Sequence, residues 1–304
     1  MRLSSPTPGF ASAAVFISAS AWGLYWIPLR ALDSQGIGGS WGVALLNAPG
    51  AVVLAIVVLF QLAAHRGHMR EAAAIGLVTG LGMALYGVGI VHTTVMRATL
   101  LFYLTPVWAT LIGIVWLEEK ATVMRWVAIG VGLIGLLLLV SGGSNTVPLG
   151  VGDVFAFFSG IAWAMGAAMI KKYEGVPLPG MTMFQFASTA FFGLLLGAVA
   201  GVLEVPSLEA LRTAIPYATL ISIAFIIPAV MILFWAQKFL FPGRVGLLMM
   251  SEVLVAGITA SLFLPEERMS GIEWAGAVLI LGACLVEVLL TPSDQTSDHT
   301  LDQT

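Results

Sequence analysis

Long runs of apolar residues, each ended by turn-forming or charged residues, fill almost the whole chain. A helix needs about 20 such residues to cross a bilayer, because each residue advances it by about 1.5 Å. Short clusters rich in Gly, Ser, Asn or charged residues separate the runs, as Glu118-Glu119-Lys120 does. The pattern predicts ten transmembrane helices, at residues 10–31, 40–63, 71–91, 96–117, 122–140, 151–171, 180–202, 213–237, 243–264 and 270–290.

The second half of the chain repeats the pattern of the first. An R-x-x-L-L sequence that begins at Arg97 recurs at Arg244, 147 residues later, and Trp126 recurs as Trp274 after 148 residues. The sequence predicts two five-helix repeats, at residues 10–140 and 151–290, followed by a polar, disordered tail at 291–304. Since five is odd, the second repeat must enter the membrane from the opposite side.

The spacing between equivalent residues grows along the chain. Trp22 corresponds to Trp163 at an offset of only 141, so we expect about seven additional residues in the second half, around Glu204–Leu211. Inverted repeats with a site near the midplane are typical of secondary transporters, since two states related by the pseudo-two-fold axis are nearly equal in energy. The expected fold class is therefore an all-α polytopic membrane protein with ten helices in two inverted five-helix repeats.

Composition supports this class. Of 304 residues, 59% are hydrophobic and only 10% charged, and the mean hydropathy is +0.99, whereas soluble domains carry about 25% charged residues. The net charge of −3 and the lack of a basic run favour no nucleic-acid partner. The single Cys284 excludes an intramolecular disulfide, and we expect it to be a small buried side chain.

The first apolar run could be mistaken for a signal peptide. Arg2 precedes it, and Ser18-Ala19-Ser20 could serve as a cleavage site. The run nevertheless continues through Trp22 and Trp26 and has a counterpart in the second half. We expect a retained first helix.

Lys and Arg residues predict the orientation, because they favour cytoplasmic loops. With the N-terminus inside, nine of them lie on the cytoplasmic side and four on the other, so both termini are expected to be cytoplasmic. The four are Arg30, Arg97, Arg212 and Arg268.

Several motifs resemble the EamA-type domain of the drug/metabolite transporter superfamily. The residues are Leu104-Thr105-Pro106-Val107-Trp108, Glu118, Trp126 and Gly130-x-Gly132-x-x-Gly135, with Glu266 and Trp274 repeated in the second half. The resemblance covers about residues 10–290 and implies ten helices, inverted repeats and export of small metabolites across a bacterial inner membrane. Within the superfamily the chain looks most like bacterial exporters of aromatic and other amino acids. It departs from the pattern at Met250-Ser251-Glu252-Val253, which stands where a proline is expected.

Glu252 is the main candidate for chemistry. It lies roughly 12 Å inside the ninth run, at about 1.5 Å per residue, and acids inside a membrane usually face a cavity or a partner. It could bind a substrate ammonium or carry a proton. Alternatively, it is protonated or paired and only locks helices together.

Aromatic and neutral polar residues at similar depth could complete a binding site. Aromatic walls stack apolar groups and attract ammonium ions, although each residue could equally serve helix packing, and each hydroxyl could bond a helical carbonyl group. The candidate substrate-binding residues are Glu252, Trp22, Tyr86, Tyr103, Trp108, Trp163, Thr105, Ser251 and Gln185.

Three basic residues are candidates for gating or charge compensation. Arg97 and Arg244 each open a helix, where a cation opposes the helix dipole. They could reach out to the headgroups or act in gating or in attracting a carboxylate. His92, at the end of the third run, could titrate near neutral pH or simply lie at the interface.

The remaining acids have structural interpretations. Asp153 suits a helix N-terminus, and Glu287 lies near a helix end. Four loop acids are expected to be solvated or in loop ion pairs: Glu118, Glu119, Glu266 and Glu267.

The sequence lacks the motifs of common enzymes and ATP-driven pumps, and it has no Cys/His cluster for a metal. We therefore expect no cofactor and no metal, and a secondary exporter of small amphipathic metabolites, amino acids first among them. An exporter of drugs or other metabolites with the same fold is the alternative, and an intramembrane enzyme a third. The partners are then a small-molecule substrate and the lipid bilayer, and a monomer is sufficient.

Overall fold

The computed structural model describes residues 6–93, 95–141, 150–263 and 269–290. Within these ranges the chain is all α, with turns and one π-helical segment but no strand, which confirms the predicted fold class. The predicted tail at 291–304 and the loop acids Glu266 and Glu267 lie outside the described residues.

The described residues of the first half form eight helices, several of them pieces of one span. They are α1 (Pro8–Trp22), α2 (Trp26–Asp33), α3 (Gly39–Phe60), α4 (Leu62–His65), α5 (Met69–His92), α6 (Val95–Phe102), α7 (Thr105–Leu117) and α8 (Val123–Leu139).

In the second half, residues 150–263 and 269–290 form seven α-helices and the π-helical segment η1. They are α9 (Val151–Lys172), α10 (Leu178–Val199), α11 (Leu208–Ile221), η1 (Ser222–Ile226), α12 (Ile227–Gln237), α13 (Pro242–Met249), α14 (Ser251–Phe263) and α15 (Gly271–Leu290).

These helices form the ten predicted spans. In the part of the chain that the structure describes, nine helical segments are long and apolar enough to cross a membrane, and α8 is a shorter apolar helix. Most bounds fall within a few residues of those predicted. The eighth span, however, begins at Leu208 and not at residue 213. Its first helix, α11, is capped by the Ser207 hydroxyl, which accepts a hydrogen bond from the Ala210 amide at 3.1 Å.

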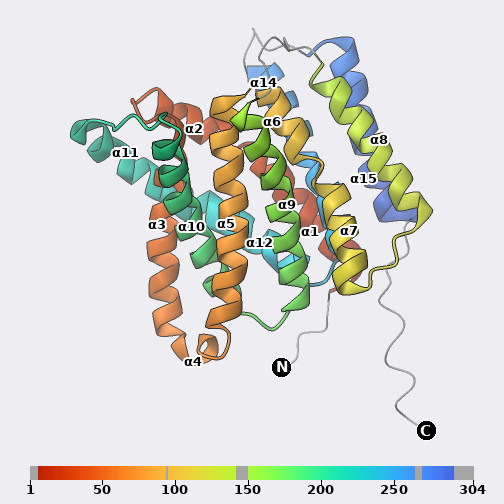
Figure 1. Ribbon diagram of the computed structural model, residues 1–304, viewed down its shortest axis with the longest axis horizontal. Helices are drawn as coiled ribbons and strands as arrows, with labels where there is room; N and C mark the ends of the chain where they lie inside the picture. Colours follow the sequence, from red (N-terminus) through yellow and green to blue (C-terminus); the bar gives the residue numbers. More distant parts are fainter. Residues whose placement is uncertain (1–5, 94, 142–149, 264–268, 291–304) are drawn as a thin grey trace.

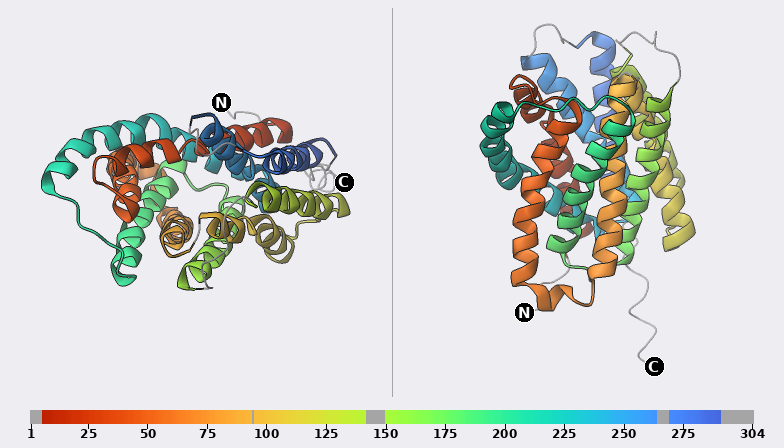
Figure 2. Two further views of the ribbon diagram at one scale, coloured as in Figure 1. Left: turned by 90° about the horizontal axis from the view of Figure 1, so that it is seen from above. Right: turned by 60° about the vertical axis from the view of Figure 1, so that its left-hand side comes forward.

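The two halves run in opposite directions through the bundle. In Figure 1 the chain enters α1 from the end where both termini are marked, and α8 finishes at the opposite end. There α9 begins, and α15 returns to the end marked by the termini, as the second view in Figure 2 also shows.

The additional residues of the second half lie within a helix and not in the loop at Glu204–Leu211, where the sequence placed them. The third span is formed by α5, Met69–His92, with 24 residues, whereas its counterpart, Leu208–Gln237, has 30. The longer span contains η1 just before Pro228, which has no amide hydrogen to bond the preceding turn. A π-turn at this point accommodates the proline within the longer helix.

Glycines allow a close helix contact between α5 and α10. A Cβ atom on Gly80 would lie 2.7 Å from the Gln185 carbonyl oxygen and 2.9 Å from the Thr189 amide nitrogen. Gly193, which lies on α10 itself, by contrast has open space at that position. Small residues therefore allow close approach at Gly80 on α5, while Gly193 is not required for it.

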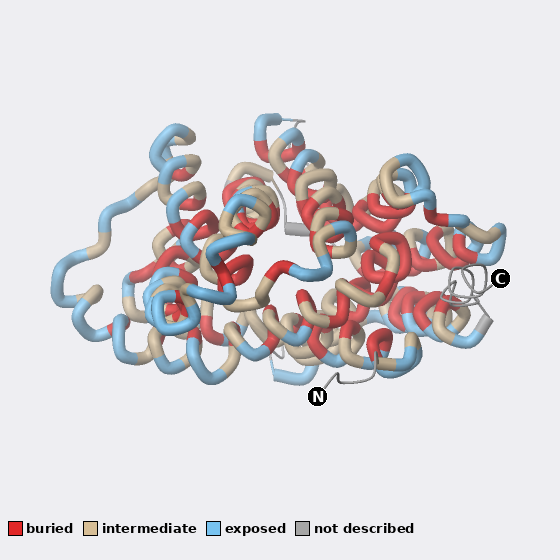
Figure 3. The backbone as a smooth tube through the Cα atoms, turned by 90° about the horizontal axis from the view of Figure 1, so that it is seen from below, coloured by how far each residue is buried: buried red, intermediate tan, exposed pale blue. Residues whose placement is uncertain are grey.

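The outside of the bundle suits lipid. Large apolar side chains such as Phe60 and Val115 are 87% and 84% exposed, and Figure 3 shows the exposed positions along the outer side of the helices, with buried ones inside. Cys284 is buried, as expected.

A buried ionic cluster joins the halves at the end of the bundle where α7 ends and α8 begins. The Arg125 guanidinium group donates to Glu119 and, at 3.0 and 3.1 Å, to Oε1 of Glu287 near the end of α15. The side chains of Arg125, Glu119 and Glu287 are 6%, 1% and 0% exposed. Of the two expectations for Glu119, solvation is wrong and an ion pair is present, but the pair is buried, because the turn after α7 directs Glu119 inward to Arg125.

Arg244 belongs to the same region. It is 4% exposed, its Nε donates to the Ser12 hydroxyl at 3.0 Å, and the charge of Glu287 acts on it. The alternative in which Arg244 reaches out to the headgroups is therefore wrong. This cation lies inside the protein, opposite a carboxylate from α15.

Candidate functional site

Three interrupted spans meet in the middle of the bundle. The first is broken between α1 and α2, the fourth between α6 and α7, and the ninth at Met250, between α13 and α14. Interrupted helices free backbone groups at membrane depth, which is tolerated where they face protein or a cavity. The breaks of the fourth and ninth spans occupy equivalent positions in the two repeats.

The break between α6 and α7 follows from one proline. Pro106 has no amide hydrogen, so the carbonyl group of Phe102 loses its helical partner. The Thr105 hydroxyl donates to this carbonyl group instead and lies 3.5 Å from the Gly160 carbonyl oxygen of α9. Thr105 therefore stabilises the break and does not line the central cavity.

The break in the ninth span places Glu252 in the first turn of α14. A carboxylate is favoured there, because the amide groups at a helix N-terminus carry partial positive charge. Gly23 lets the end of α1 pack directly on this turn: a Cβ atom at Gly23 would lie 2.9 Å from the Val255 Cβ atom. The Tyr103 hydroxyl also hydrogen-bonds to the Glu252 side chain.

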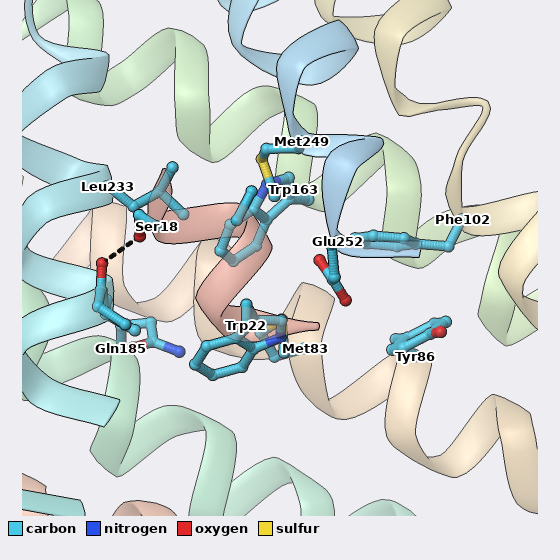
Figure 4. A pocket seen from close by; sticks show the side chains of 13 residues that line it. Ser18, Trp22, Met83, Tyr86, Phe102, Trp163, Gln185, Leu233, Met249 and Glu252 are labelled. Carbon is cyan, nitrogen blue, oxygen red and sulfur yellow. Dashed lines mark hydrogen bonds between the residues drawn. The ribbon is translucent and has the colours of Figure 1, made fainter. Parts of the chain in front are cut away.

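Two adjoining chambers surround Glu252. The outer chamber has a volume of about 270 Å³ and the inner one about 30 Å³. They share four lining residues, Trp22, Met83, Tyr86 and Glu252. Figure 4 shows the Glu252 carboxylate directed into the space between Trp22, Tyr86 and Phe102. The chambers thus form one cavity with a narrow inner end.

The walls are mainly aromatic. Trp22 stacks on Tyr25 with ring centroids 4.6 Å apart, and Tyr86 packs on Phe102 at 4.7 Å. Trp163 lines the inner chamber and donates its indole N–H to the sulfur of Met249 at 3.2 Å. Aromatic faces of this kind attract cations and stack on apolar groups.

Neutral polar groups are few and mostly paired. Asn47 donates to the Val43 carbonyl oxygen at 2.8 Å and hydrogen-bonds to the Tyr25 hydroxyl. Tyr86 and Thr99 hydroxyls lie 3.2 Å apart. In each case the polar atoms of the outer chamber are held by a neighbour, which fixes the walls around Glu252.

Gln185 on α10 is the exception. Its Nε2 donates to the Thr189 hydroxyl at 3.1 Å, while its Oε1 is buried without a hydrogen-bond partner in the described part of the chain. Gln185 lines the inner chamber together with Glu252.

The structure brings six of the nine predicted binding residues together around the two chambers: Glu252, Trp22, Tyr86, Tyr103, Trp163 and Gln185. Their role in binding a substrate stays a prediction. Two others lie elsewhere, in addition to Thr105. Trp108 packs edge-on against Phe157 with centroids 5.4 Å apart, and the Ser251 hydroxyl donates to the Phe16 carbonyl oxygen at 3.2 Å.

The predicted basic residues lie away from the chambers as far as they are described. Arg244 is in the ionic cluster, and His92 ends α5 against Gly152 of α9. The side chain of Arg97 lies outside the described residues. Asp153 caps α9, accepting hydrogen bonds from the Gly150 amide and the Thr93 hydroxyl at 2.8 Å each, in agreement with its expected structural role.

Sequence reasoning missed several lining residues, among them Phe102 and Asn47. Phe102 lies beside a helix break, and a rule that ranks aromatic residues next to expected breaks would have found it. Asn47 lies two residues before Pro49 inside α3, and a polar residue so close to a membrane-helix proline was an available signal.

Comparison with known proteins gives consistent matches along the chain. The sequence model of the EamA-like transporter family matches twice, at residues 9–141 and 150–289. A protein of Archaeoglobus fulgidus described as an uncharacterized transporter is 25% identical over 223 residues, which cover 71% of this chain and 76% of that protein. The uncharacterized transporter YvbV of Bacillus subtilis is 24% identical over 250 residues, 78% of each chain.

One solved structure, described only as the crystal structure of a protein, has a similar fold. It superposes with a TM-score of 0.69 at 17% sequence identity, over 92% of this chain and 97% of that one. At this identity the likeness concerns the fold alone.

Proposed function

Because the chain belongs to the EamA-like transporter family, we propose that it is a secondary transporter that exports small amphipathic metabolites by alternating access. Amino acids with large apolar or aromatic side chains are the first candidates. The membrane is then a bacterial inner membrane, with both termini on the cytoplasmic side.

One observation carries the proposal: a carboxyl group lies in an aromatic cavity between the two repeats. Trp22 and Tyr86 come from the first repeat, and Trp163 and Glu252 from the second. A site shared by both repeats changes its access when one repeat moves against the other, as alternating access requires.

The two ends of the cavity differ in the described residues. Trp26, Leu29 and Ile90, which line the outer chamber, lie on the parts of α2 and α5 near the end of the bundle opposite the termini. At the other end the halves are joined by the buried cluster of Arg125, Glu287 and their partners. This difference supports a state in which the cavity faces away from the termini; in the opposite state the contacts of this cluster would have to separate.

Glu252 has two possible roles in transport. As a carboxylate it attracts the ammonium group of an amino acid; as a carboxylic acid it carries a proton that a substrate could replace. Both require the acid and both fail with an amide, which has a similar shape but no charge and no exchangeable acidic proton.

Counterflow in liposomes tests the proposal. Purified protein is reconstituted with an unlabelled amino acid inside, and uptake of the labelled compound is followed for a series of apolar and aromatic amino acids. We expect counterflow with the wild type, loss of it in Glu252→Gln, and retention in Glu273→Gln, a control acid in the first turn of α15 that does not line the chambers. Transport by Glu252→Gln that equals the wild type over a range of pH would exclude a role for this acid.

The second candidate is an exporter of the same fold that carries drugs or other metabolites. It is favoured because aromatic side chains outnumber polar ones in the walls of the cavity. Overexpression should protect cells against toxic amino-acid analogues if the first candidate is right, and against apolar toxic cations or drugs if the second is. The intramembrane enzyme is the third candidate, and the family and its relatives are described as transporters.

A further inference from the structure

Building on the proposed function, we propose that the inner chamber is a seat for the N–H groups of a primary ammonium, formed by Glu252 and Gln185, and that the substrate's carboxylate is dispensable. The substrate class is then amphipathic primary amines, of which aromatic amino acids are one kind. This site would recognise the ammonium end of the substrate alone, whereas a site for a zwitterion would recognise both the ammonium and the carboxylate.

The orientation of the Gln185 amide follows from its partner. The Thr189 hydroxyl donates its only proton to the Gln185 backbone carbonyl oxygen, at 2.9 Å. The side-chain atom that faces this hydroxyl at 3.1 Å must therefore be the N–H donor, Nε2. Oε1 is left as a buried acceptor without a partner in the described residues, and a ligand that fills this need must bring an N–H or O–H group.

The dimensions of the two chambers orient the ligand. The inner chamber, at about 30 Å³, exceeds the roughly 10–15 Å³ that one water molecule needs by only a factor of about two. It holds an ammonium group but not an aromatic ring. The apolar body then lies in the outer chamber of about 270 Å³, which Trp22, Tyr25 and Trp26 line.

The charge of the lining is one-sided. Glu252 is the one charged residue among the described residues that line either chamber. The rings of Trp22, Phe102 and Trp163 border the inner chamber and favour a cation over an anion. The carboxylate of a zwitterion would leave water without meeting an opposite charge in this lining, so removal of the carboxylate should not weaken binding.

Four ligands with the same phenyl ring test the proposal on the wild-type full chain in detergent. They are 2-phenylethylamine, L-phenylalanine, 3-phenylpropionate and trimethyl-2-phenylethylammonium, with binding measured by calorimetry and by tryptophan fluorescence. We expect the primary amine to bind at least as tightly as phenylalanine, the quaternary ammonium at least tenfold more weakly than the primary amine, and the propionate not to bind.

Two variants distinguish a hydrogen bond from Gln185 to the ligand from a general effect on helix packing. Gln185→Leu should weaken binding of the primary amine by about 10- to 100-fold, the range for a hydrogen bond to a charged group. The affinity for the quaternary ammonium should be unchanged. Gln237→Leu is the matched control, since Gln237 is also a buried glutamine of a membrane helix but does not line either chamber. Its affinities should equal those of the wild type.

The outcomes separate this inference from the proposed function. If phenylalanine and 3-phenylpropionate bind while 2-phenylethylamine does not, the ammonium seat is wrong and export of amino acids stands. An equal loss of all ligands in Gln185→Leu would also overturn the seat. If the binding series follows expectation but counterflow fails with every compound, the seat stands and the transporter proposal falls.

Discussion

The ionic cluster of Arg125 permits a prediction about stability that depends on charge balance. Arg125→Met removes the cation that bridges Glu119 and Glu287, and leaves two buried carboxylates opposite the single Arg244. The double variant Glu119→Gln/Arg125→Met removes one charge of each sign, so that Glu287 and Arg244 remain as a balanced pair. We expect the double variant to be more stable than the single one, although it lacks more native groups.

The magnitude follows from the geometry. At the 3.0 Å separation of Arg125 and Glu287, two unit charges attract each other by about 5 kcal/mol with an effective dielectric constant of about 20. Burial of each ion costs several kcal/mol, so the intact pair contributes little net, but removal of one partner typically costs about 3–5 kcal/mol. Arg125→Met should lower the free energy of unfolding by that amount, and the double variant should recover about half of the loss.

The free energy of unfolding can be measured by reversible unfolding in mixed micelles, with the fluorescence of the tryptophans as the signal. The matched control is Arg70→Met, which removes an exposed arginine at the start of α5 and should change stability by no more than about 0.5 kcal/mol. A double variant as unstable as Arg125→Met, or less stable, would refute the reasoning from charge balance. It would mean that shape and packing, and not the unpaired charge, set the cost.

Three further predictions concern packing, topology and the helix break. Gly80→Ala should destabilise the protein by about 1–3 kcal/mol through overpacking against α10, whereas Gly193→Ala, with open space beside it, should be neutral in the same unfolding assay. In intact cells, a membrane-impermeant thiol reagent should label Ser34→Cys and not Lys120→Cys, two exposed positions at opposite ends of the bundle. The reverse labelling would invert the proposed orientation. Labelling of both variants from outside would contradict the proposal that the two positions lie on opposite sides of the membrane. Thr105→Val should cost about 1–3 kcal/mol, because the carbonyl group before the break between α6 and α7 loses its donor, and Thr105→Ser should restore most of it.

The spans could be predicted from the sequence because one property, the length of apolar runs, decides membrane insertion. Six of the residues predicted to bind substrate also line the cavity, since acids, tryptophans and tyrosines at membrane depth need polar or cavity-facing surroundings. Trp108 and Ser251 are residues of the same kinds at similar depth, but their side chains contact neighbouring helices. The depth of a residue could be counted along the chain. The direction of its side chain depends on how each interrupted helix is rotated about its own axis.

The ionic cluster could not be predicted for a related reason. Glu119 and Glu287 are separated by more than half of the chain, and each alone has the pattern of an acid at a helix end. Only the packing of α8 beside α15 brings both carboxylates to Arg125. The position of the additional residues was missed as well, because they extend an apolar helix and leave no break in the hydrophobic pattern.

The longer eighth span makes the two repeats unequal. Under the proposed alternating access, identical repeats would make the inward- and outward-facing arrangements equal in energy, because each repeat would only take over the role of the other. A span of 30 residues opposite one of 24 removes that equality, and each 1.4 kcal/mol of difference shifts the ratio of the two arrangements about tenfold. On this proposal the empty protein rests mainly in one arrangement, and tighter binding of the substrate to the other arrangement has to supply the free energy that populates it.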